Sequence, residues 1–404
     1  MDEGSTSHSR DLVLRHPTPD ECVKIWTATA ESWGDTLPFS LYLKESQYLT
    51  TIPLAKNGNR TDWILVNKNL PPDQRPILSS CETFRKRSLT SDALGNITES
   101  IVHGIASVFC HPDYRSQGYA ARLMKELANV LPTWQLKTAS PCVGTILYSD
   151  IGKSYYSKLG WHPNATNLHI EFAPKISNSE TTAILEEHLE GLCQRDEARV
   201  RKLMAVPSKD IARRVTIVPD VDHILWHIKK EEFATEYLFG KIPHAKGAII
   251  GEPGRQIWAI WTHRYYDNPT SSSANNVLYI LRLVVESDKT ATRLPLDAGN
   301  VQMEHYDEQL NYLKAVLKAA QAEAAAWKLN CVKLWDPTPL VRKMVMESSV
   351  EHTVVEREED SIASGMWIKG FMGVYFDFGV SMLVTIGTII DFESADPIGE
   401  TAKV

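Results

Sequence analysis

The residues with the clearest chemical meaning form one short run, Arg115-Ser-Gln-Gly-Tyr-Ala120, which leads directly into a helical pattern. The first N–H groups of a helix have no partner within the helix, and the helix dipole is positive there, so this end binds anions. Gly118 has no side chain to keep a phosphate from the backbone, and a residue larger than Ala120 would block the same approach. No Ser, Thr, Asp or Asn stands at the expected cap position. We therefore predict that the phosphates of a ligand cap this helix.

Strand and helix patterns on either side of the run would hold it in place. A strongly apolar strand pattern covers residues 99–111. Apolar residues then recur every three or four positions, which predicts one buried helix face, and Pro132 ends the helix. A strand pattern over 143–148 and a short helical pattern over 152–159 follow. The order is strand, loop, helix, strand, helix, and it belongs to a mixed α/β unit.

Arg115, Gly118 and Ala120 resemble motif A of the GNAT superfamily of N-acetyltransferases, whose pattern is Arg/Gln-x-x-Gly-x-Gly/Ala. The resemblance implies that acetyl-CoA is the cosubstrate. It also implies that backbone amides of the loop hold the pyrophosphate and that the main chain of the preceding strand binds the pantetheine arm. The residues implied in cofactor binding are Val108, Phe109, Cys110, Arg115, Ser116, Gln117, Gly118, Tyr119 and Ala120.

Downstream, the run Tyr155-Tyr-Ser-Lys-Leu-Gly-Trp161 is similar to motif B of the same superfamily, Tyr-x-x-x-Gly-Phe/Trp. The family tyrosine lies four residues before the glycine, which corresponds to Tyr156. A phenol near the coenzyme sulfur can protonate the departing thiolate. Packing against the cofactor is the alternative role for Tyr156, and Tyr155 is expected to turn toward the core.

Longer strings resemble the two-domain lysine N-acetyltransferases of yeasts and other fungi, over residues 12–367. They are SCETFRKRSL from Ser80, HGIASVFCHPDYRSQGYAARLM from His103, LYSDIGKSYYSKLGW from Leu147 and ILWHIKKEEF from Ile224. The resemblance implies that the side-chain amine of free lysine is acetylated, as in lysine catabolism. Another small amine or a secondary-metabolite intermediate is the alternative acceptor. A non-catalytic module that only binds coenzyme A is the contrasting class.

A lysine side-chain amine has a pKa of about 10.4, so the enzyme must remove a proton before the amine can attack. Three residues on the predicted strands beside the acceptor cleft could act as the base: His103, Glu82 and Glu99. His103 and Glu82 are preferred, His103 because the pKa of histidine lies near neutrality. Direct attack within one ternary complex gains its rate from orientation. The oxyanion would be stabilised by a backbone N–H near Cys110.

The acceptor's carboxylate would be recognised best by an arginine, whose planar fork binds it with two hydrogen bonds. Arg85 and Arg87 lie on one face of a predicted strand, and Arg85 is the preferred candidate. Trp226, from the second half, is expected to close the pocket. Cys110 and His111 are also residue types of a nucleophile and its base, but the cysteine falls where the strand would bind pantetheine.

Composition sets the wider limits. The 404 residues exceed one ordinary core, and 43% hydrophobic and 23% charged residues are typical of a globular protein. The net charge of -7 gives no support for nucleic-acid binding. Six scattered cysteines without a CxxC pair predict neither a metal site nor a disulfide framework and suit a reducing compartment, so we expect a cytoplasmic protein. The apolar run 371–390 reads as buried strands rather than a membrane segment.

We expect an α/β fold with a mixed sheet (α+β), as a GNAT domain over residues 11–175 closed by a strand at 168–172. A second, degenerate GNAT-like domain is expected over residues 176–404. It repeats the order long strand, long helix, strand, but its sequence between Glu286 and Gln302 contains nothing like the phosphate-binding run. A strand is predicted at 224–228 in this half. The sequence predicts no oligomeric state.

Overall fold

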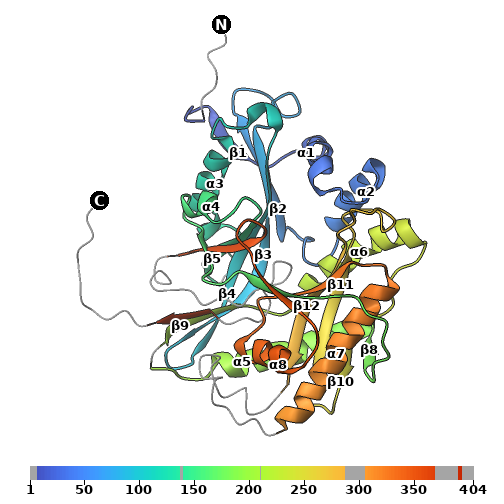
Figure 1. Ribbon diagram of the computed structural model, residues 1–404. Coiled ribbons are helices and arrows are strands. Elements are labelled where there is room, and N and C mark those ends of the chain that lie inside the picture. The colour runs from blue at the N-terminus through green and yellow to red at the C-terminus, as the bar shows by residue number, and fades with distance from the viewer. Residues whose placement is uncertain (1–6, 137–139, 210, 287–304, 369–389, 394–404) are drawn as a thin grey trace.

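The computed structural model describes residues 7–136, 140–209, 211–286, 305–368 and 390–393, which form two mixed sheets with helices between and around them (Figure 1). The helices are α1 Pro19–Trp33, α2 Phe39–Leu49, α3 Tyr119–Val130, α4 Ser154–Ser157, α5 Glu186–Met204, α6 Val221–Phe239, α7 Tyr306–Ala326 and α8 Pro339–Glu347, with 3-10 turns at Pro112–Tyr114 and Leu131–Thr133. The strands are β1 Leu12–Arg15, β2 Arg60–Asn67, β3 Ser79–Asp92, β4 Ile97–Cys110, β5 Cys142–Ser149, β6 His162–Pro163, β7 Leu168–Phe172, β8 Thr182–Ile184, β9 Ile211–Ile217, β10 Gly247–Ile250, β11 Ile257–Arg264, β12 Val277–Val285, β13 Cys331–Trp335, β14 Thr353–Glu356, β15 Ile362–Trp367 and β16 Ile390–Glu393.

The first sheet has the order β1-β2-β3-β4-β5-β15-β6, with β9 beside β3 and β16 beside β9. Helices α3 and α4 lie on one side of it, and α1 and α2 lie on the other (Figure 1). Side chains alternate along a strand, so Ile105 of β4 packs with Leu123 and Leu127 of α3, whereas Val102 points to the opposite face. The face opposite α3 is therefore the one that meets α1, α2 and the second half.

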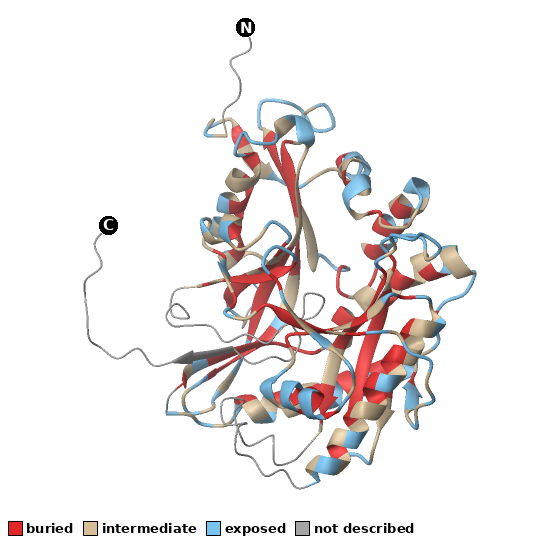
Figure 2. Cartoon of the chain, viewed as in Figure 1, coloured by how far each residue is buried: buried red, intermediate tan, exposed pale blue. Residues whose placement is uncertain are grey.

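The second sheet has the order β14-β7-β13-β12-β11-β10-β8. Its outer face is covered by α7, whose Leu313 and Leu317 share a core with Trp261 and Ile280. Its inner face is covered by α5 and α6, since Leu189 and Ile228 pack there with Trp258 and Tyr279. Buried residues run along both sheets (Figure 2). Helix α6 thus lies between the two sheets, where it can reach the first.

Two strands join other sheets than the sequence predicts. We expected β7 to close the first sheet, but it pairs with β13 and β14 of the second. The place beside β5 is taken by β15, which comes from far along the chain. Ile170 and Phe172 of β7 bury their side chains in the second core, and this burial decides the choice. The boundary between residues 175 and 176 stays a prediction. Strand β7 precedes it in the sequence but belongs to the second sheet, and β15 follows it but belongs to the first.

The strand predicted at 224–228 is wrong, because these residues lie within helix α6. Ile224 and Ile228 are four positions apart and both are buried, which is a helical spacing. Asp220 caps the helix by accepting a hydrogen bond from the His223 N–H at 3.3 Å. A short apolar run is ambiguous between strand and helix, and the cap was the signal that could have decided it.

The helix predicted after the phosphate-binding run was confirmed, since α3 begins at Tyr119. Helix α1 begins with a capping box between Thr18 and Glu21. Residues 371–389 of the apolar run, and most of the segment between Glu286 and Gln302, lie outside the described residues. In the part of the chain that is described, no helix combines the length and apolar character needed to cross a membrane.

Candidate active site

The predicted phosphate-binding loop forms the N-terminal end of α3. Gly118 is the N-cap with φ +82°, and no side chain caps the helix. Ser116 also has a positive φ, of +62°. Such left-handed positions turn successive backbone N–H groups toward one concave side, which is how anion-binding loops are built. A Cβ atom on Gly118 would come within 2.8 Å of Ser7 Oγ, so the space above this glycine is narrow. A helix start without a side-chain cap, preceded by two left-handed residues, has the chemistry that an anion such as a pyrophosphate needs.

Strands β4 and β5 separate where the loop begins. They run parallel with a register that ends at Ile105 and Leu147, while β4 continues to Cys110. On its other edge, β5 pairs with β15 from Gly144 to Ser149. The β4 edge from Ala106 to Cys110 therefore has no β5 partner, and its main chain can bind an extended ligand. A cavity of about 470 Å³ adjoins this end of β4, lined by Phe109, His111 and α1.

A bulge in β4 lies at the point of separation. The pairing with β3 shifts between Ser80 and Glu82, and Ser107 adopts φ +53°. The Ser107 hydroxyl donates to Glu82 Oε1 at 2.6 Å, and Arg60 Nε pairs with Glu82 Oε2 at 2.8 Å. Because its neighbour Cys81 packs on the α3 side, Glu82 faces α1 and α2. Glu82 thus lies at the bulge, on the face of the sheet that meets α1, α2 and the second half.

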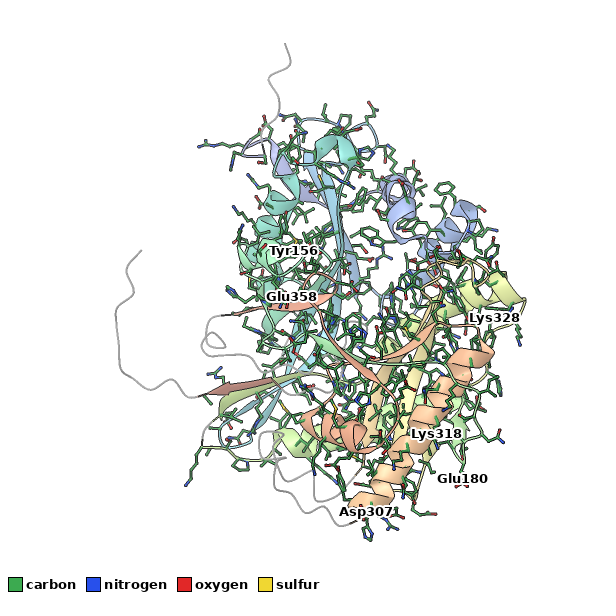
Figure 3. All side chains as sticks on the ribbon, in the orientation of Figure 1. Tyr156, Glu180, Asp307, Lys318, Lys328 and Glu358 are labelled. Atoms are coloured by element: carbon green, nitrogen blue, oxygen red, sulfur yellow. The ribbon has the colours of Figure 1, made fainter. Side chains whose placement is uncertain are left out.

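Tyr156 lies in the short helix α4 within the first half (Figure 3). It is 8% exposed and belongs to the core that includes Ile105 and Leu123. Burial raises its pKa, so the phenol holds its proton at neutral pH. Tyr155, which we expected to be the core residue, is the more exposed of the two and contacts Tyr156 edge to face at 5.0 Å.

The other predicted base, His103, does not lie on the acceptor side. It is fully buried on the α3 face, two positions before Ile105, with Nε2 at 3.2 Å from the Trp134 carbonyl oxygen. Burial lowers its pKa to about 4, so it is neutral at pH 7. Glu99 lies near the start of β4 and pairs with Arg201 at 2.5 Å, at the opposite end of the strand from the bulge. Of the three candidates, the geometry favours Glu82.

The predicted carboxylate partner Arg85 also points away from the acceptor side. It is paired with His103 across the strands, and its Nε donates to the Gln135 carbonyl at 3.3 Å. Arg87 is held at the surface by Glu197, at 3.0 Å. Trp226 does reach the predicted side, since α6 carries it edge to face against Phe84 with ring centroids 4.9 Å apart. The structure brings Trp226 and Glu82 to one face and leaves Arg85 on the other.

Cys110 is not an activated nucleophile. Burial raises the pKa of its thiol, and Sγ donates to the Leu78 carbonyl at 3.3 Å. Its side chain packs on the α3 core, while His111 is held by the Asp113 side chain at 3.4 Å. A thiolate is needed for nucleophilic attack, and this environment disfavours it.

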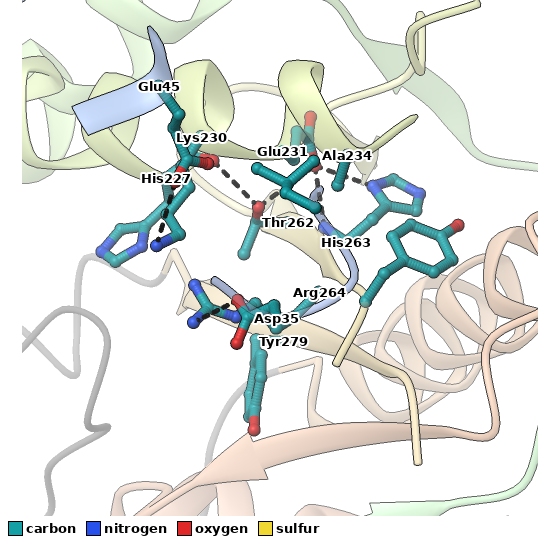
Figure 4. A pocket seen from close by; sticks show the side chains of 12 residues that line it. Asp35, Glu45, His227, Lys230, Glu231, Ala234, Thr262, His263, Arg264 and Tyr279 are labelled. Carbon is teal, nitrogen blue, oxygen red and sulfur yellow. Dashed lines mark hydrogen bonds and ion pairs between the residues drawn. The ribbon is translucent and has the colours of Figure 1, made fainter. Parts of the chain in front are cut away.

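Sequence reasoning missed the charged residues that α2 and the loop before it place opposite α6. Helix α2 itself was not predicted. Asp35 and Glu45 face Lys230 and Arg264 of the second half across a shared pocket (Figure 4). These four residues come from distant segments, so no local pattern could have grouped them.

Comparison with known proteins agrees with this geometry. The model of the acetyltransferase (GNAT) family matches residues 88–161, and the model of the LYC1 GNAT-like C-terminal domain matches residues 167–371, about half of the chain. The second match begins with β7, the strand that joins the second sheet.

Two curated relatives are similar in sequence. A lysine acetyltransferase of Yarrowia lipolytica is 24% identical over 300 residues, which cover 63% of this chain and 73% of that protein. The uncharacterized protein YGR111W of Saccharomyces cerevisiae is 23% identical over 191 residues, 41% of this chain and 47% of that protein.

The fold also resembles solved structures. Saccharomyces cerevisiae N-myristoyltransferase with bound myristoyl-CoA has a TM-score of 0.50 at 9% identity, covering 92% of this chain and 86% of that one. At this identity the likeness concerns the fold alone. The family models carry the assignment: the chain belongs to the LYC1-like family of GNAT acetyltransferases and is an acetyl-CoA-dependent acyltransferase with a GNAT domain and a second, GNAT-like domain.

Proposed function

We propose that this acetyltransferase acetylates the side-chain amine of free L-lysine, the first step of a lysine-degrading route. The observation that carries the acceptor is the similarity to the Yarrowia lipolytica lysine acetyltransferase. Acetyl-CoA supplies the acetyl group as a thioester, which an unprotonated amine can attack. The position of Trp226 against Phe84 supports an acceptor site enclosed by both halves.

The first half would bind and orient the coenzyme. The loop from Arg115 to Ala120 would hold its pyrophosphate through backbone N–H groups, and the free edge of β4 from Val108 to Cys110 would hold the pantetheine arm. A backbone N–H near Cys110 would stabilise negative charge on the carbonyl oxygen. Tyr156 would donate its proton to the leaving sulfur, since a phenol is protonated at neutral pH.

Glu82 would accept the proton of the acceptor amine, directly or through a water molecule. Its carboxylate faces α1 and α2 at the β4 bulge and is held by Ser107 and Arg60. These two contacts orient the carboxylate. A lysine amine is mostly protonated at this pH, so the step is required for turnover.

Thiol release from acetyl-CoA, measured with a panel of amines and followed by mass spectrometry of the product, tests this function. We expect the highest kcat/KM with L-lysine and a product acetylated on the side-chain amine. Higher kcat/KM with a polyamine or a secondary-metabolite amine would replace lysine by that acceptor. Tight acetyl-CoA binding without thiol release for any amine would contradict catalysis altogether and leave a coenzyme-binding module.

A further inference from the structure

Lys86 lies in the interface between the two halves and has no role in the proposed chemistry. It follows Glu82 and Phe84 on one face of β3, because side chains alternate along a strand. This face meets α6, since Phe84 contacts Trp226. The preceding residue, Arg85, points to the α3 side instead. Lys86 is therefore a cation on the same face as the proposed base.

The room for the Lys86 side chain comes from a glycine of the neighbouring strand. A Cβ atom on Gly104 would lie 2.5 Å from Lys86 Cε and 3.7 Å from its Nζ, so a side chain there would collide with the lysine. Lys86 pairs with Val102 across the strands, and Gly104 lies two positions further along β4. The amine therefore leans along the sheet toward Glu82. The lysine keeps part of its surface exposed, so a small molecule can reach it.

The surroundings of Lys86 compensate its charge poorly. Val102, on the same face, packs in an apolar cluster with Val215 and Trp367. Within the described part of the chain, the Lys86 ammonium makes no hydrogen bond or ion pair, and Asp220 acts on it only at longer range. Burial lowers its pKa to about 8. A cation taken out of water without a counter-ion is unfavourable, and an anionic ligand would supply the counter-ion.

His223 of α6 lies over Lys86, between two contacts that fix the helix on β3. The chain just before α6 donates a backbone hydrogen bond to the Arg87 carbonyl at 2.9 Å. Three residues after His223, and on the same side of the helix, Trp226 packs on Phe84. His223 thus lies between these contacts on the helix, as Lys86 does on the strand.

His223 has a ring nitrogen without a partner. Its Nδ1 lies 2.6 Å from Asp220 Oδ1, so Nδ1 carries the proton and donates to that carboxylate. The residue is only 3% exposed, and Nε2 has no hydrogen-bond partner among the described residues. Burial and the charge of Lys86 lower the pKa of His223, so the ring is neutral at pH 7. An anion beside Lys86 would reverse the second effect, and Nε2 could then take up a proton and donate.

Two N–H donors on facing elements suit a carboxylate. The ammonium group of Lys86 and a charged imidazole can each donate a charge-assisted hydrogen bond to one of its two oxygens. A phosphate has a third oxygen that the apolar cluster around Val102 cannot pair. An amine or a neutral ligand would leave the charge of Lys86 uncompensated.

We propose that Lys86 and His223 form a carboxylate-binding site between the two halves, on the face of β3 that carries Glu82. The carboxylate can belong to the acceptor or to a separate small molecule, and only the first source rests on the proposed function. Both sources use the same contacts, because the site consists of the β3 and α6 side chains alone.

Hexanoate is the probe, because it has a carboxylate and no amine that could be acetylated. It should slow the modification of Lys86 by an amine-reactive succinimidyl ester, followed by peptide mass spectrometry. Lys86→Met keeps the stem and removes the charge, so calorimetry should show hexanoate binding at least about 10-fold weaker. Lys318→Met is the matched control, because Lys318 is an exposed lysine of α7 (Figure 3). Equal affinity in the wild type and Lys86→Met would overturn the site.

The stability of Lys86→Met protects this test against misfolding. Methionine removes an uncompensated cation from apolar surroundings, so the Tm of the variant should equal or exceed that of the wild type. A lysine that only stabilises the fold would lower the Tm when it is replaced. A lower Tm would therefore contradict the description of Lys86 as a residue held for a ligand.

His223→Gln tests the second donor. Calorimetry of hexanoate binding at pH 7, in two buffers of different ionisation enthalpy, should show proton uptake by the wild type. Lys86 already holds its proton at this pH, and the other charged groups at this end of α6, Asp220, Arg87 and Glu197, stay ionised. The variant should therefore lose the uptake. Unchanged uptake would overturn the assignment of His223.

Steady-state kinetics separate the two sources. Competition between hexanoate and L-lysine, with a loss of kcat/KM in Lys86→Met for L-lysine but not for hexylamine, would identify the acceptor's carboxylate. Inhibition without competition would identify a separate carboxylate. If the wild type acetylates no amine, the proposed function fails, and the binding of hexanoate still decides whether the site exists.

Discussion

Each half of the molecule contains a parallel strand pair joined by a helix, β4–α3–β5 in the first and β12–α7–β13 in the second. In both pairs the register ends before the first strand does, at Ile105 in β4 and at Ile280 in β12. The scaffold that separates two strands is therefore common to both halves. The difference lies in what each half places at the opening.

The helix starts show this difference most clearly. Helix α3 follows Gly118 and has no acidic residue in its first turn, whereas α7 follows His305 and begins with Asp307 and Glu308. Carboxylates at this end stabilise the helix dipole themselves and repel a phosphate. Asp307 is an exposed residue at this end of α7 (Figure 3). The positive end of the α3 dipole thus has no carboxylate beside it, whereas Asp307 and Glu308 offset the positive end of the α7 dipole.

The helices that follow the second strands differ in the same sense. Helix α4 presents Tyr156 beside the β4–β5 opening, whereas α8 buries Val341, Met344 and Val345 in the core under α7. Apolar side chains thus pack under α7 where the first half places a tyrosine in its core. The comparison teaches that one strand-helix-strand scaffold carries different side chains in the two halves, and under the proposed function only the first half catalyses.

The largest effect is expected from adding a side chain at the start of α3, which removes the main difference between the two halves. Gly118→Val should weaken acetyl-CoA binding by about 100-fold or more, because the side chain would fill the approach to several charge-assisted N–H donors. Calorimetry measures the affinity. Gly254→Val is the control: it has φ +88° with open space around it, so it carries the same backbone strain without touching the loop. Undiminished affinity in Gly118→Val would contradict the phosphate-binding role.

Removing the proton donor should have the next largest effect. Tyr156→Phe keeps the ring in the core and should lower kcat about ten- to several-hundredfold, with little change in acetyl-CoA affinity. Tyr306→Phe in the second half loses a comparable hydroxyl, which donates to Glu347 at 2.6 Å, and should not affect turnover. A normal rate in Tyr156→Phe would reduce this residue to packing.

Two buried histidines, one in each half, should respond to pH in opposite directions. Burial lowers the pKa of His103 to about 4, so the unfolded chain binds its proton more tightly, and stability falls as the pH drops from about 6.5 toward 4. Glu231 and Glu323 raise the pKa of His263 against its burial, so its contribution is complete below pH 6.5 and is lost as the pH rises above its folded pKa.

Denaturant unfolding of His103→Gln and His263→Gln between pH 4 and 9 checks this prediction. In His103→Gln, the free energy of unfolding should no longer fall by roughly 1 kcal/mol per pH unit as the pH drops below about 6.5. In His263→Gln, it should no longer fall as the pH rises above about 6.5. Parallel changes in the two variants would show that the two environments do not differ as described.

The smallest expected effect is a factor of two in stoichiometry. If α7 cannot bind a phosphate, calorimetric titration with acetyl-CoA should give one coenzyme per chain. Gly118→Val should abolish that single event. A second, weaker event that survives in the variant would mean that the second half also binds coenzyme.

Much of the first half could be predicted because its signals are local. The phosphate-binding loop, the start of α3 at Tyr119 and the capping box of α1 depend on residues within a few positions of one another. Glycine conformation, helix caps and apolar spacing act over such short distances, so they can be read from the chain. The family resemblance rests on the same local motifs and was confirmed by both family models.

Only the tertiary structure decided which faces and sheets these elements share. The alternation along β4 and β3 places His103 and its partner Arg85 on the α3 side, but what covers the other face depends on where α1, α2 and α6 pack. Strand β7 joined the second sheet because burial there involves partners more than 100 residues away, such as Leu313 in α7. The ion pairs between the two halves, Glu45 with Lys230 and Asp35 with Arg264, form in the same way. Long-range burial and ion pairing leave no local pattern in a sequence, so these contacts exist only once the chain is folded.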